Sequence, residues 1–223
     1  MDNPPPLRSF GRLKSRPIKP RQAALMDSLL PQIRVPQAPF DPRALMPGAT
    51  EVWLEIGFGG GEHMAGQAER HPDVLILGAE PFLNGVASGL RHLDERGLTN
   101  VRLQDGDARE LIAHLPDAAL DRVFILFPDP WPKARHHKRR LITPETLADL
   151  ARVLKPGGRL RFATDWADYA DWTLERVLAS GLFAWGAERA DDWRVAPADH
   201  LTTRYEEKRL GDCAPVFLDF ARI

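Results

Sequence analysis

Short apolar runs bounded by glycine, proline and charged residues recur along the chain from residue 51 onward. Runs of this length and setting are typical of strands in a buried sheet. They predict strands at 52–56, 74–80, 100–104, 120–126, 159–164 and 216–220. At 159–162, arginines alternate with Leu160 and Phe162, which predicts one polar and one apolar face for that strand.

The segments between these strands have the length and the mixed polarity of helices. We expect helices from the end of a glycine turn at 57–61 to about residue 70, and at 83–96, 108–114 and 167–180. Another helix begins after Thr143, a good N-cap followed by Pro144, and ends at the Lys-Pro-Gly-Gly run of 155–158. Strands that alternate with helices predict an α/β fold with a doubly wound, mainly parallel sheet.

Residues 1–22 lack apolar periodicity and are rich in proline, lysine and arginine. This composition predicts a flexible basic arm that orders on a polyanion, although an inert disordered terminus has the same composition. A short helix at 23–30 opens what we expect to be a single domain, residues 23–223.

The overall composition narrows the class of protein. Of 223 residues, 43% are hydrophobic and 27% charged, as in ordinary globular proteins. Neither a bilayer-spanning stretch of roughly 20 apolar residues nor the apolar core of a signal peptide is present, so we expect a cytoplasmic protein without membrane association. Cys213 is the single cysteine, which excludes an internal disulfide and a cysteine-rich metal site. The net charge is -1, so attraction for a polyanion must come from local basic segments.

A glycine-rich turn follows the first predicted strand, with the pattern Glu-x-Gly-x-Gly-x-Gly at 55–61. A dinucleotide fingerprint would place glycine or alanine where Glu62 stands, and a Walker phosphate loop would need a following Gly-Lys-Ser/Thr, so both are disfavoured. The pattern resembles the first motif of class I S-adenosylmethionine-dependent methyltransferases. Glycines there let the backbone approach a cofactor closely.

Acidic residues stand at the ends of the first three predicted strands, namely Glu55, Glu80 and Asp107. Glu55 suits the cofactor's ammonium group and Glu80 its ribose hydroxyls. In proteins of this type the position of Asp107 binds the adenine amino group, although Asp107 also suits a helix N-cap. The expected cofactor-binding residues are Glu55, Gly57, Gly59, Gly61, Glu80, Asp107, Ala108 and Asp129.

Asp129 lies in a loop that prolines at 128, 130 and 132 stiffen, just past the carboxyl end of the strand at 120–126. Ligands bind at that edge of open α/β sheets. A strongly basic run follows at 133–140, which suits a phosphate-rich substrate, although a solvated basic loop or a targeting signal would look the same. His136 and His137 lack the spacing of metal ligands, so no metal is expected.

The segment 127–140 resembles the signature of the bacterial-type tRNA (guanine-N7-)-methyltransferase family, and segments 9–14, 54–59, 164–165 and 203–206 match its other motifs. One departure is the segment around Glu80, where the family more often has other neighbours. The resemblance implies a Rossmann-like, seven-stranded fold and methyl transfer from S-adenosylmethionine to N7 of guanosine, usually at position 46 of the tRNA variable loop.

The resemblance also implies roles for individual residues. Asp129 would be the catalytic residue as well as a cofactor ligand. The implied substrate contacts are Lys133, Asp165, Thr203 and Glu206. The implied tRNA contacts are Arg135, His136, His137, Lys138, Arg139 and Arg140. Without the resemblance, Asp165 is also a plausible helix N-cap, and Thr203 and Glu206 an ordinary turn.

Two rival functions share part of this pattern. A small-molecule methyltransferase would need the cofactor motif but not the basic run, and a non-catalytic RNA-binding module would need the basic run but not the motif. Guanine N7 carries a free lone pair, so its methylation needs alignment and stabilisation of developing positive charge rather than a general base. The partner expected is tRNA, bound by a monomer or homodimer.

Overall fold

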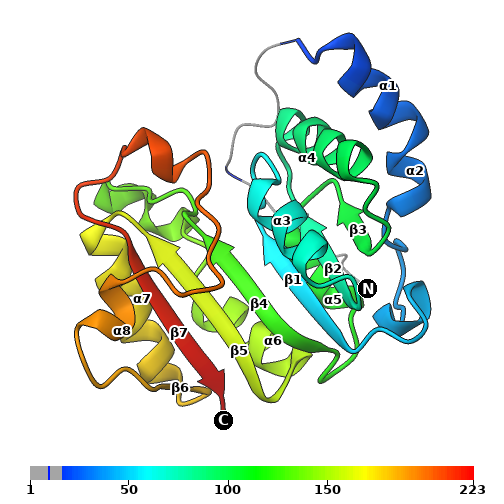
Figure 1. Cartoon of the computed structure of the whole chain (residues 1–223). Coiled ribbons are helices and arrows are strands. Elements are labelled where there is room, and N and C mark those ends of the chain that lie inside the picture. The colour runs from blue at the N-terminus through cyan, green and yellow to red at the C-terminus, as the bar shows by residue number, and fades with distance from the viewer. Residues whose placement is uncertain (1–9, 11–16) are drawn as a thin grey trace, which may run out of the picture.

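One twisted sheet runs through the structure, a computed structural model that describes Phe10 and residues 17–223 (Figure 1). Its seven strands lie in the order β3-β2-β1-β4-β5-β7-β6. Strands β1 to β5 pair in parallel, whereas β7 pairs antiparallel with both β5 and β6. The strands are β1 Glu51–Ile56, β2 Val74–Ala79, β3 Val101–Gln104, β4 Leu120–Leu126, β5 Leu154–Thr164, β6 Phe183–Trp185 and β7 Val216–Arg222. The predicted mainly parallel, seven-stranded α/β fold is therefore confirmed.

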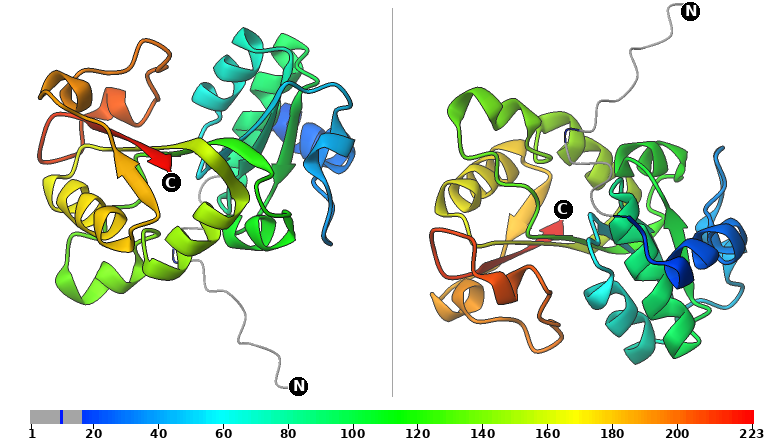
Figure 2. Two further views of the ribbon diagram at one scale, coloured as in Figure 1. Left: turned by 90° about the horizontal axis from the view of Figure 1, so that it is seen from below. Right: turned by 90° about the horizontal axis from the view of Figure 1, so that it is seen from above.

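Helices cover both faces of the sheet (Figure 2). The α-helices are α1 Pro20–Ser28, α2 Leu30–Ile33, α3 Glu62–Arg70, α4 Leu83–Arg96, α5 Ala108–His114, α6 Pro144–Val153, α7 Ala167–Ser180 and α8 Asp191–Arg194, and the short 3-10 helices are η1 Pro42–Leu45, η2 Ala134–Arg139 and η3 Glu206–Lys208. Helices α5, α6 and α7 share a hydrophobic cluster with one face of the sheet, and α3 and α4 with the other. In the described part of the chain, no helix is long and apolar enough to cross a membrane.

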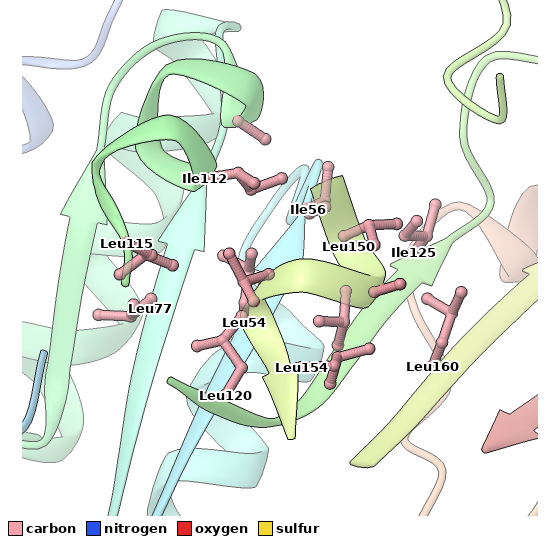
Figure 3. Packing of buried hydrophobic residues seen from close by; sticks show 14 of the residues in the cluster. Leu54, Ile56, Leu77, Ile112, Leu115, Leu120, Ile125, Leu150, Leu154 and Leu160 are labelled. Carbon is pink, nitrogen blue, oxygen red and sulfur yellow. The ribbon is translucent and has the colours of Figure 1, made fainter. Parts of the chain in front are cut away.

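The larger cluster shows how the parallel strands are stabilised (Figure 3). Leu54, Leu77 and Leu120 come from neighbouring strands and pack against Ile112 of α5 and Leu150 of α6. Each of the three strand leucines is fully buried, which stabilises the fold by about 1.5–3 kcal/mol per side chain. This packing fixes the register of the strands whose ends form the site described below.

Local rules place most element ends correctly. The expected helices at 83–96, 108–114 and 167–180 have those bounds in the structure. Thr143 caps α6 as expected, because its hydroxyl accepts a hydrogen bond from the Thr146 N–H. The predicted stop at 155–158 is wrong in detail: α6 ends at Val153, and the Pro-Gly-Gly run belongs to β5, with Gly157 at φ 76°.

One further expectation needs correction, and one strand has no counterpart among those predicted. Helix α1 begins at Pro20, so residues 20–22 belong to a helix rather than to the basic arm. The rest of that arm, except Phe10 and residues 17–19, lies outside the described residues. Strand β6 was not predicted, since its three residues are too few to show a period.

The order of the sheet determines where a ligand can bind. Strand β1 lies between β2 and β4. From β1 the chain first adds β2 and β3 on one side and then adds β4 and β5 on the other, so the winding direction reverses between β1 and β4. At such a switch point the connections after the neighbouring strands separate and leave a crevice at the carboxyl ends. The glycine turn after β1 and the loop after β4 both open at this edge.

Candidate active site

A cavity of about 1560 Å³ lies at the carboxyl ends of β1, β2 and β4. Its lining includes Glu55, Gly57, Gly59, Glu80, Asp107, Ala108, Asp129, Trp131, Thr203 and Tyr205. Sites for one small molecule usually measure roughly 300–1,000 Å³, so this cavity is larger than a site for one small molecule requires. It brings together most of the expected cofactor residues with one of the expected substrate residues.

The glycine turn gives the cavity a floor made of backbone. Gly57 and Gly59 have φ angles of 72° and 53°, a left-handed conformation that only glycine adopts at little cost. Gly61, expected to contact the cofactor, is instead buried outside the lining. A Cβ on Gly61 would lie 2.7 Å from Cα of Gly89, so this glycine lets α3 and α4 pack closely.

Glu80 is held by backbone donors on both sides. Its carboxylate accepts hydrogen bonds from the N–H groups of Gly59, at 2.7 Å, and Phe82, at 2.8 Å. Burial nevertheless raises the pKa of Glu80 to about 7, and the nearby carboxylates of Asp129 and Glu55 add to the effect. The site therefore contains a buried acid that is oriented by backbone N–H groups rather than by an ion pair within the described residues.

Glu55 and Asp107 reach the cavity with part of their hydrogen-bonding capacity already used. The side chain of Glu55 is 5% exposed, and one oxygen lies 2.6 Å from Nδ1 of His63. Asp107 accepts the backbone N–H of Arg109 at 3.0 Å, which makes it the N-cap of α5. Burial opposes ionisation of Asp107, but the hydrogen bonds from Arg109 outweigh it and lower the pKa. Both interpretations of Asp107, as a cap and as part of the cavity wall, thus hold in the same structure.

The loop after β4 is strained. Phe127 and Trp131 have φ angles of 51° and 45°, which cost about 1–3 kcal/mol each in residues with a side chain. Asp129 lies between them, is an exposed residue and lines the cavity. Desolvation by the surrounding protein raises its pKa. Such strain persists only where neighbouring structure holds the loop.

Arg140 holds the strained loop in place, and its burial shows that one expectation was wrong. Its side chain is only 1% exposed, so Arg140 does not offer its charge to tRNA as predicted. The guanidinium donates to the carbonyl oxygen of Pro130 at 2.9 Å and pairs with Asp168 of α7. It also lies 4.8 Å from the ring centres of both Tyr169 and Trp172. Arg140 therefore ties the strained loop to α7.

The rest of the basic run forms the short 3-10 helix η2, for which the sequence predicted no regular element. Lys133, Arg135 and Lys138 are exposed, and Arg139 is partly buried, with its guanidinium 4.8 Å from the ring of Trp131. The two histidines of the run are partly buried: His136 packs on Trp131, at 6.0 Å, and His137 packs on Trp172, at 5.2 Å. The cations available to a polyanion thus lie beside the cavity, which Lys138 and Arg139 help to line.

Only one of the four expected substrate residues lines the cavity. Thr203 lines the cavity, whereas Lys133, Asp165 and Glu206 do not. Glu206 accepts the N–H of Thr203 at 2.7 Å and contacts Nε2 of His200 at 2.9 Å. Burial opposes ionisation of Glu206, but the hydrogen bonds from His200 and Thr203 prevail and lower its pKa. In this structure Glu206 stabilises the turn that carries Thr203.

Asp165 is buried at the end of β5. One carboxylate oxygen accepts the N–H of Gly211 at 2.9 Å, and the other has no hydrogen-bond partner among the described residues. Burial raises the pKa of this acid. A Cβ on Gly211 would overlap Asp165, so the segment after η3 closes over the carboxylate. Contact between Asp165 and a substrate therefore requires this segment to move, and the contact stays a prediction.

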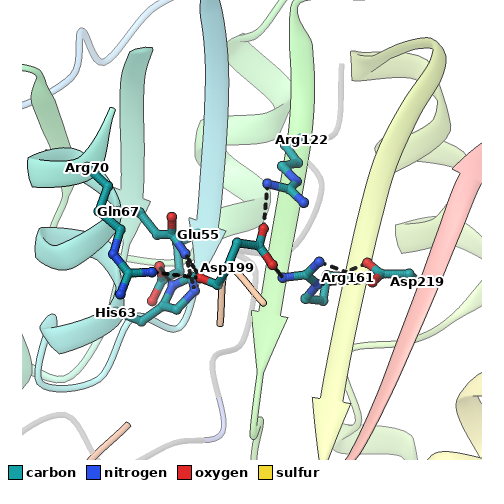
Figure 4. Close-up of polar contacts among 8 residues, drawn as sticks. All are labelled: Glu55, His63, Gln67, Arg70, Arg122, Arg161, Asp199 and Asp219. Carbon is teal, nitrogen blue, oxygen red and sulfur yellow. Dashed lines mark hydrogen bonds and ion pairs between the residues drawn. The ribbon is translucent and has the colours of Figure 1, made fainter. Parts of the chain in front are cut away.

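Sequence reasoning missed the polar network that supports the Thr203 segment (Figure 4). The carboxylate of Asp199 contacts Arg122 of β4 at 2.9 Å and Arg161 of β5 at 2.7 Å, and Arg161 also pairs with Asp219 of β7. The predicted polar face at Arg159 and Arg161 is thus only partly right: Arg159 is exposed, but Arg161 is buried. No local pattern signals this, since the covering segment comes from the far end of the chain.

Comparisons with known proteins agree with this architecture. A family model described as a putative methyltransferase matches residues 49–216. The chain is 69% identical over 218 residues to the tRNA (guanine-N(7)-)-methyltransferase of Caulobacter sp. (strain K31), covering 98% of this chain and 96% of the relative. It is 46% identical over 223 residues to the protein of the same name from Rhodospirillum rubrum, covering 96% and 88%.

Among solved structures, the fold is similar to a 16S rRNA (adenine(1408)-N(1))-methyltransferase from Catenulisporales acidiphilia, with a TM-score of 0.55 at 17% identity over 82% of this chain and 92% of that one. It is also similar to a precorrin-6y C5,15-methyltransferase from Geobacter metallireducens, with a TM-score of 0.53 at 18% identity over 81% and 84%. At these identities the likeness shows the fold alone.

The role of Arg140 as a tie can be tested by Arg140→Gln. We expect the free energy of unfolding to fall by about 2 kcal/mol, because glutamine can replace neither the two cation–π interactions nor the hydrogen bond to Pro130. Urea unfolding followed by tryptophan fluorescence measures this. Lys138→Gln, an exposed cation of the same segment, should change stability by less than about 0.5 kcal/mol. Equal stability of the two variants would show that Arg140 does not hold the loop.

Proposed function

Since the chain belongs to the tRNA (guanine-N7-)-methyltransferase family, we propose that it transfers the methyl group of S-adenosylmethionine to N7 of a guanosine in tRNA. The target we propose is position 46 of the variable loop, as the motif resemblance implies. One observation carries the proposal: the acids Glu80, Asp107 and Asp129 face a single cavity, beside the exposed cations of η2. A group of carboxylates in a cavity with cations beside it suits a cationic cofactor and a polyanionic substrate.

The polar groups that line the cavity fit S-adenosylmethionine. When bound, this cofactor supplies an activated methyl group on a sulfonium centre. Glu80 has acceptor capacity for two ribose hydroxyls, because a carboxylate offers several lone pairs beyond those its two backbone donors occupy. Glu55 offers a negative charge for an ammonium group, and Asp107 an acceptor for an amino group. Gly57 and Gly59 leave open space where side chains would otherwise stand.

Asp129 is the proposed catalytic residue. N7 of guanine attacks with its own lone pair, so the protein needs to align the base and to stabilise the positive charge that the ring gains. The carboxylate of Asp129, a residue that lines the cavity, is suited to both tasks. Arg140 and the left-handed residues on either side of Asp129 restrict its position, which is what alignment demands.

The tRNA is held, in this proposal, by the cations that remain exposed. Lys133, Arg135 and Lys138 are exposed on and beside η2, and Arg139 stacks on Trp131 next to the cavity. Cations of this kind position a nucleic acid through its phosphates without reading its sequence. A small-molecule methyltransferase would have no use for them.

The first prediction concerns the reaction itself. Incubation with methyl-labelled S-adenosylmethionine and unmodified tRNA, followed by nucleoside analysis, should yield N7-methylguanosine in the variable loop. Asp129→Asn should lower the rate by at least about 100-fold and leave the melting temperature unchanged, since Asp129 is an exposed residue and asparagine has nearly the same shape. Asp171→Asn, an exposed acid of α7, is the matched control. Label in another nucleoside would overturn the base assignment, and full activity of Asp129→Asn the catalytic role.

The second prediction concerns pH. Below its pKa of about 7, free Glu80 is protonated, and a protonated carboxyl accepts the ribose hydroxyls less well. Cofactor binding must then release a proton, so affinity should fall with falling pH, by about tenfold between pH 8 and pH 6. Calorimetry in two buffers of different ionisation enthalpy measures both the affinity and the proton release. Glu80→Gln should bind more weakly and without this dependence; the same pH dependence in Glu80→Gln would contradict the assignment.

The third prediction concerns salt. The logarithm of tRNA affinity should fall linearly with the logarithm of salt concentration, because phosphate contacts release counterions. Replacing Arg135 and Lys138 together by alanine should reduce the slope by about 2, one for each phosphate that is no longer neutralised. Arg159→Ala, an exposed arginine of β5, should leave the slope unchanged. An unaltered slope in the double variant would mean that η2 does not contact tRNA.

A further inference from the structure

A chain of buried polar groups connects the glycine-turn side of the cavity to the segment that carries Thr203 (Figure 4). Nδ1 of His63 lies 2.6 Å from the carboxylate of Glu55, and Nε2 of His63 lies 3.1 Å from the side-chain nitrogen of Gln67. That nitrogen also donates to the backbone carbonyl of Asp199 at 2.7 Å. His63 and Gln67 are each 1% exposed, so water does not compete for these contacts.

The acceptor at each end of this series, the Glu55 carboxylate and the Asp199 carbonyl, fixes the direction of every hydrogen bond between them. A backbone carbonyl only accepts, so Gln67 must turn its NH2 group toward Asp199. The same NH2 group faces His63, so Nε2 of His63 must be the acceptor and Nδ1 must carry the hydrogen that Glu55 accepts. The remaining Gln67 oxygen, Oε1, has no partner among the described residues, which is the cost of this orientation. His63 is therefore neutral and leaves the charge of Glu55 intact.

The ring of His63 has a second contact with the same distant segment. Its centre lies 6.0 Å from that of His200, whose Nε2 contacts Glu206 at 2.9 Å. On its other side it packs edge-on against Phe124 of β4, at 5.0 Å. His63 thus touches the cofactor side of the cavity through Glu55, and the segment 199–206 through both Gln67 and His200.

We propose that His63 is a positioning residue that serves both halves of the site. Through Nδ1 it orients the Glu55 carboxylate toward the cavity without neutralising it, so that a cationic group can be bound there. Through Nε2 and Gln67 it fixes the backbone at Asp199, and with it the placement of Thr203. The inference rests on the proposed function for the identity of the two ligands, whereas the direction of the hydrogen bonds does not.

Two conservative variants separate the two tasks. The amide nitrogen of asparagine stands about where Nδ1 stands in histidine, so His63→Asn keeps the donor for Glu55 and removes the acceptor for Gln67. The amide of glutamine reaches about as far as Nε2, so His63→Gln keeps an acceptor for Gln67 and removes the donor for Glu55. Glu69→Gln changes an exposed residue of the same helix and is the control.

The expected results differ in which ligand is affected. His63→Gln should raise the Kd for S-adenosylmethionine, measured by calorimetry, by about tenfold, with the KM for tRNA within about twofold of wild type. His63→Asn should keep the cofactor Kd within about twofold and lower kcat/KM for tRNA, at saturating cofactor, by about tenfold. In wild type, long-range ¹H–¹⁵N spectra should show one histidine with hydrogen on Nδ1 only, and this signal should disappear in His63→Asn.

Several outcomes would overturn the proposal. These are wild-type values of both constants in both variants, equal loss of both constants in both variants together with a lower melting temperature, or a spectrum with His63 protonated on Nε2. A failure of the proposed function looks different: the wild-type protein itself would then not methylate tRNA. In that case the tautomer of His63 still tests the hydrogen-bond direction.

Discussion

The pairing of Asp199 with Arg122 and Arg161 is the interaction on which the C-terminal wall of the site depends. The Arg161 side chain is 5% exposed, and a buried guanidinium without partners would cost several kcal/mol. Asp199 and Asp219 compensate this charge, and although burial opposes ionisation of Asp199, the two arginines outweigh it and lower its pKa. If the segment that carries Thr203 left the sheet, Arg122 would lose its ion pair with Asp199 and Arg161 would keep only Asp219. Ion pairs therefore hold this wall in addition to the packing of Tyr205 against the hydrophobic core.

The opposite wall is fixed in a related way. There a buried arginine, Arg140, holds a loop whose left-handed residues would otherwise relax. Each wall thus depends on a guanidinium that is shielded from water, while the floor between them is the glycine turn on the end of β1. Rigid placement of this kind suits a reaction whose nucleophile needs no base, because the protein then contributes mainly alignment and charge stabilisation.

How far the sequence predicts this site follows from the range of the interactions involved. Apolar runs, the Thr143 cap and the acids at strand ends are local features, and they place the strands other than β6 and most of the cavity lining correctly. In the sequence, Arg140 looks like one more surface cation, because its partners Tyr169 and Trp172 belong to α7, which follows α6 and β5 in the chain. Glu206 likewise reads as a substrate contact until the structure shows its carboxylate occupied by Thr203 and His200. In both cases the sequence leaves open which polar groups pair with one another, whether the partner lies in a distant helix, as for Arg140, or within six residues, as for Glu206.

The carboxylates Glu80 and Asp129 also bear on how the proposed reaction exchanges its cofactor. Methyl transfer moves one positive charge from the sulfonium centre to the guanine ring, so the total charge within the cavity does not change. Burial raises the pKa of Glu80 and the nearby carboxylate of Asp129 adds to the effect, so a cation between or beside the two acids stabilises their ionised forms before and after transfer. The demethylated cofactor, which no longer carries the sulfonium charge, is held less strongly by these acids than the substrate cofactor. The same electrostatic arrangement that favours binding of the reactants therefore also favours release of the spent cofactor.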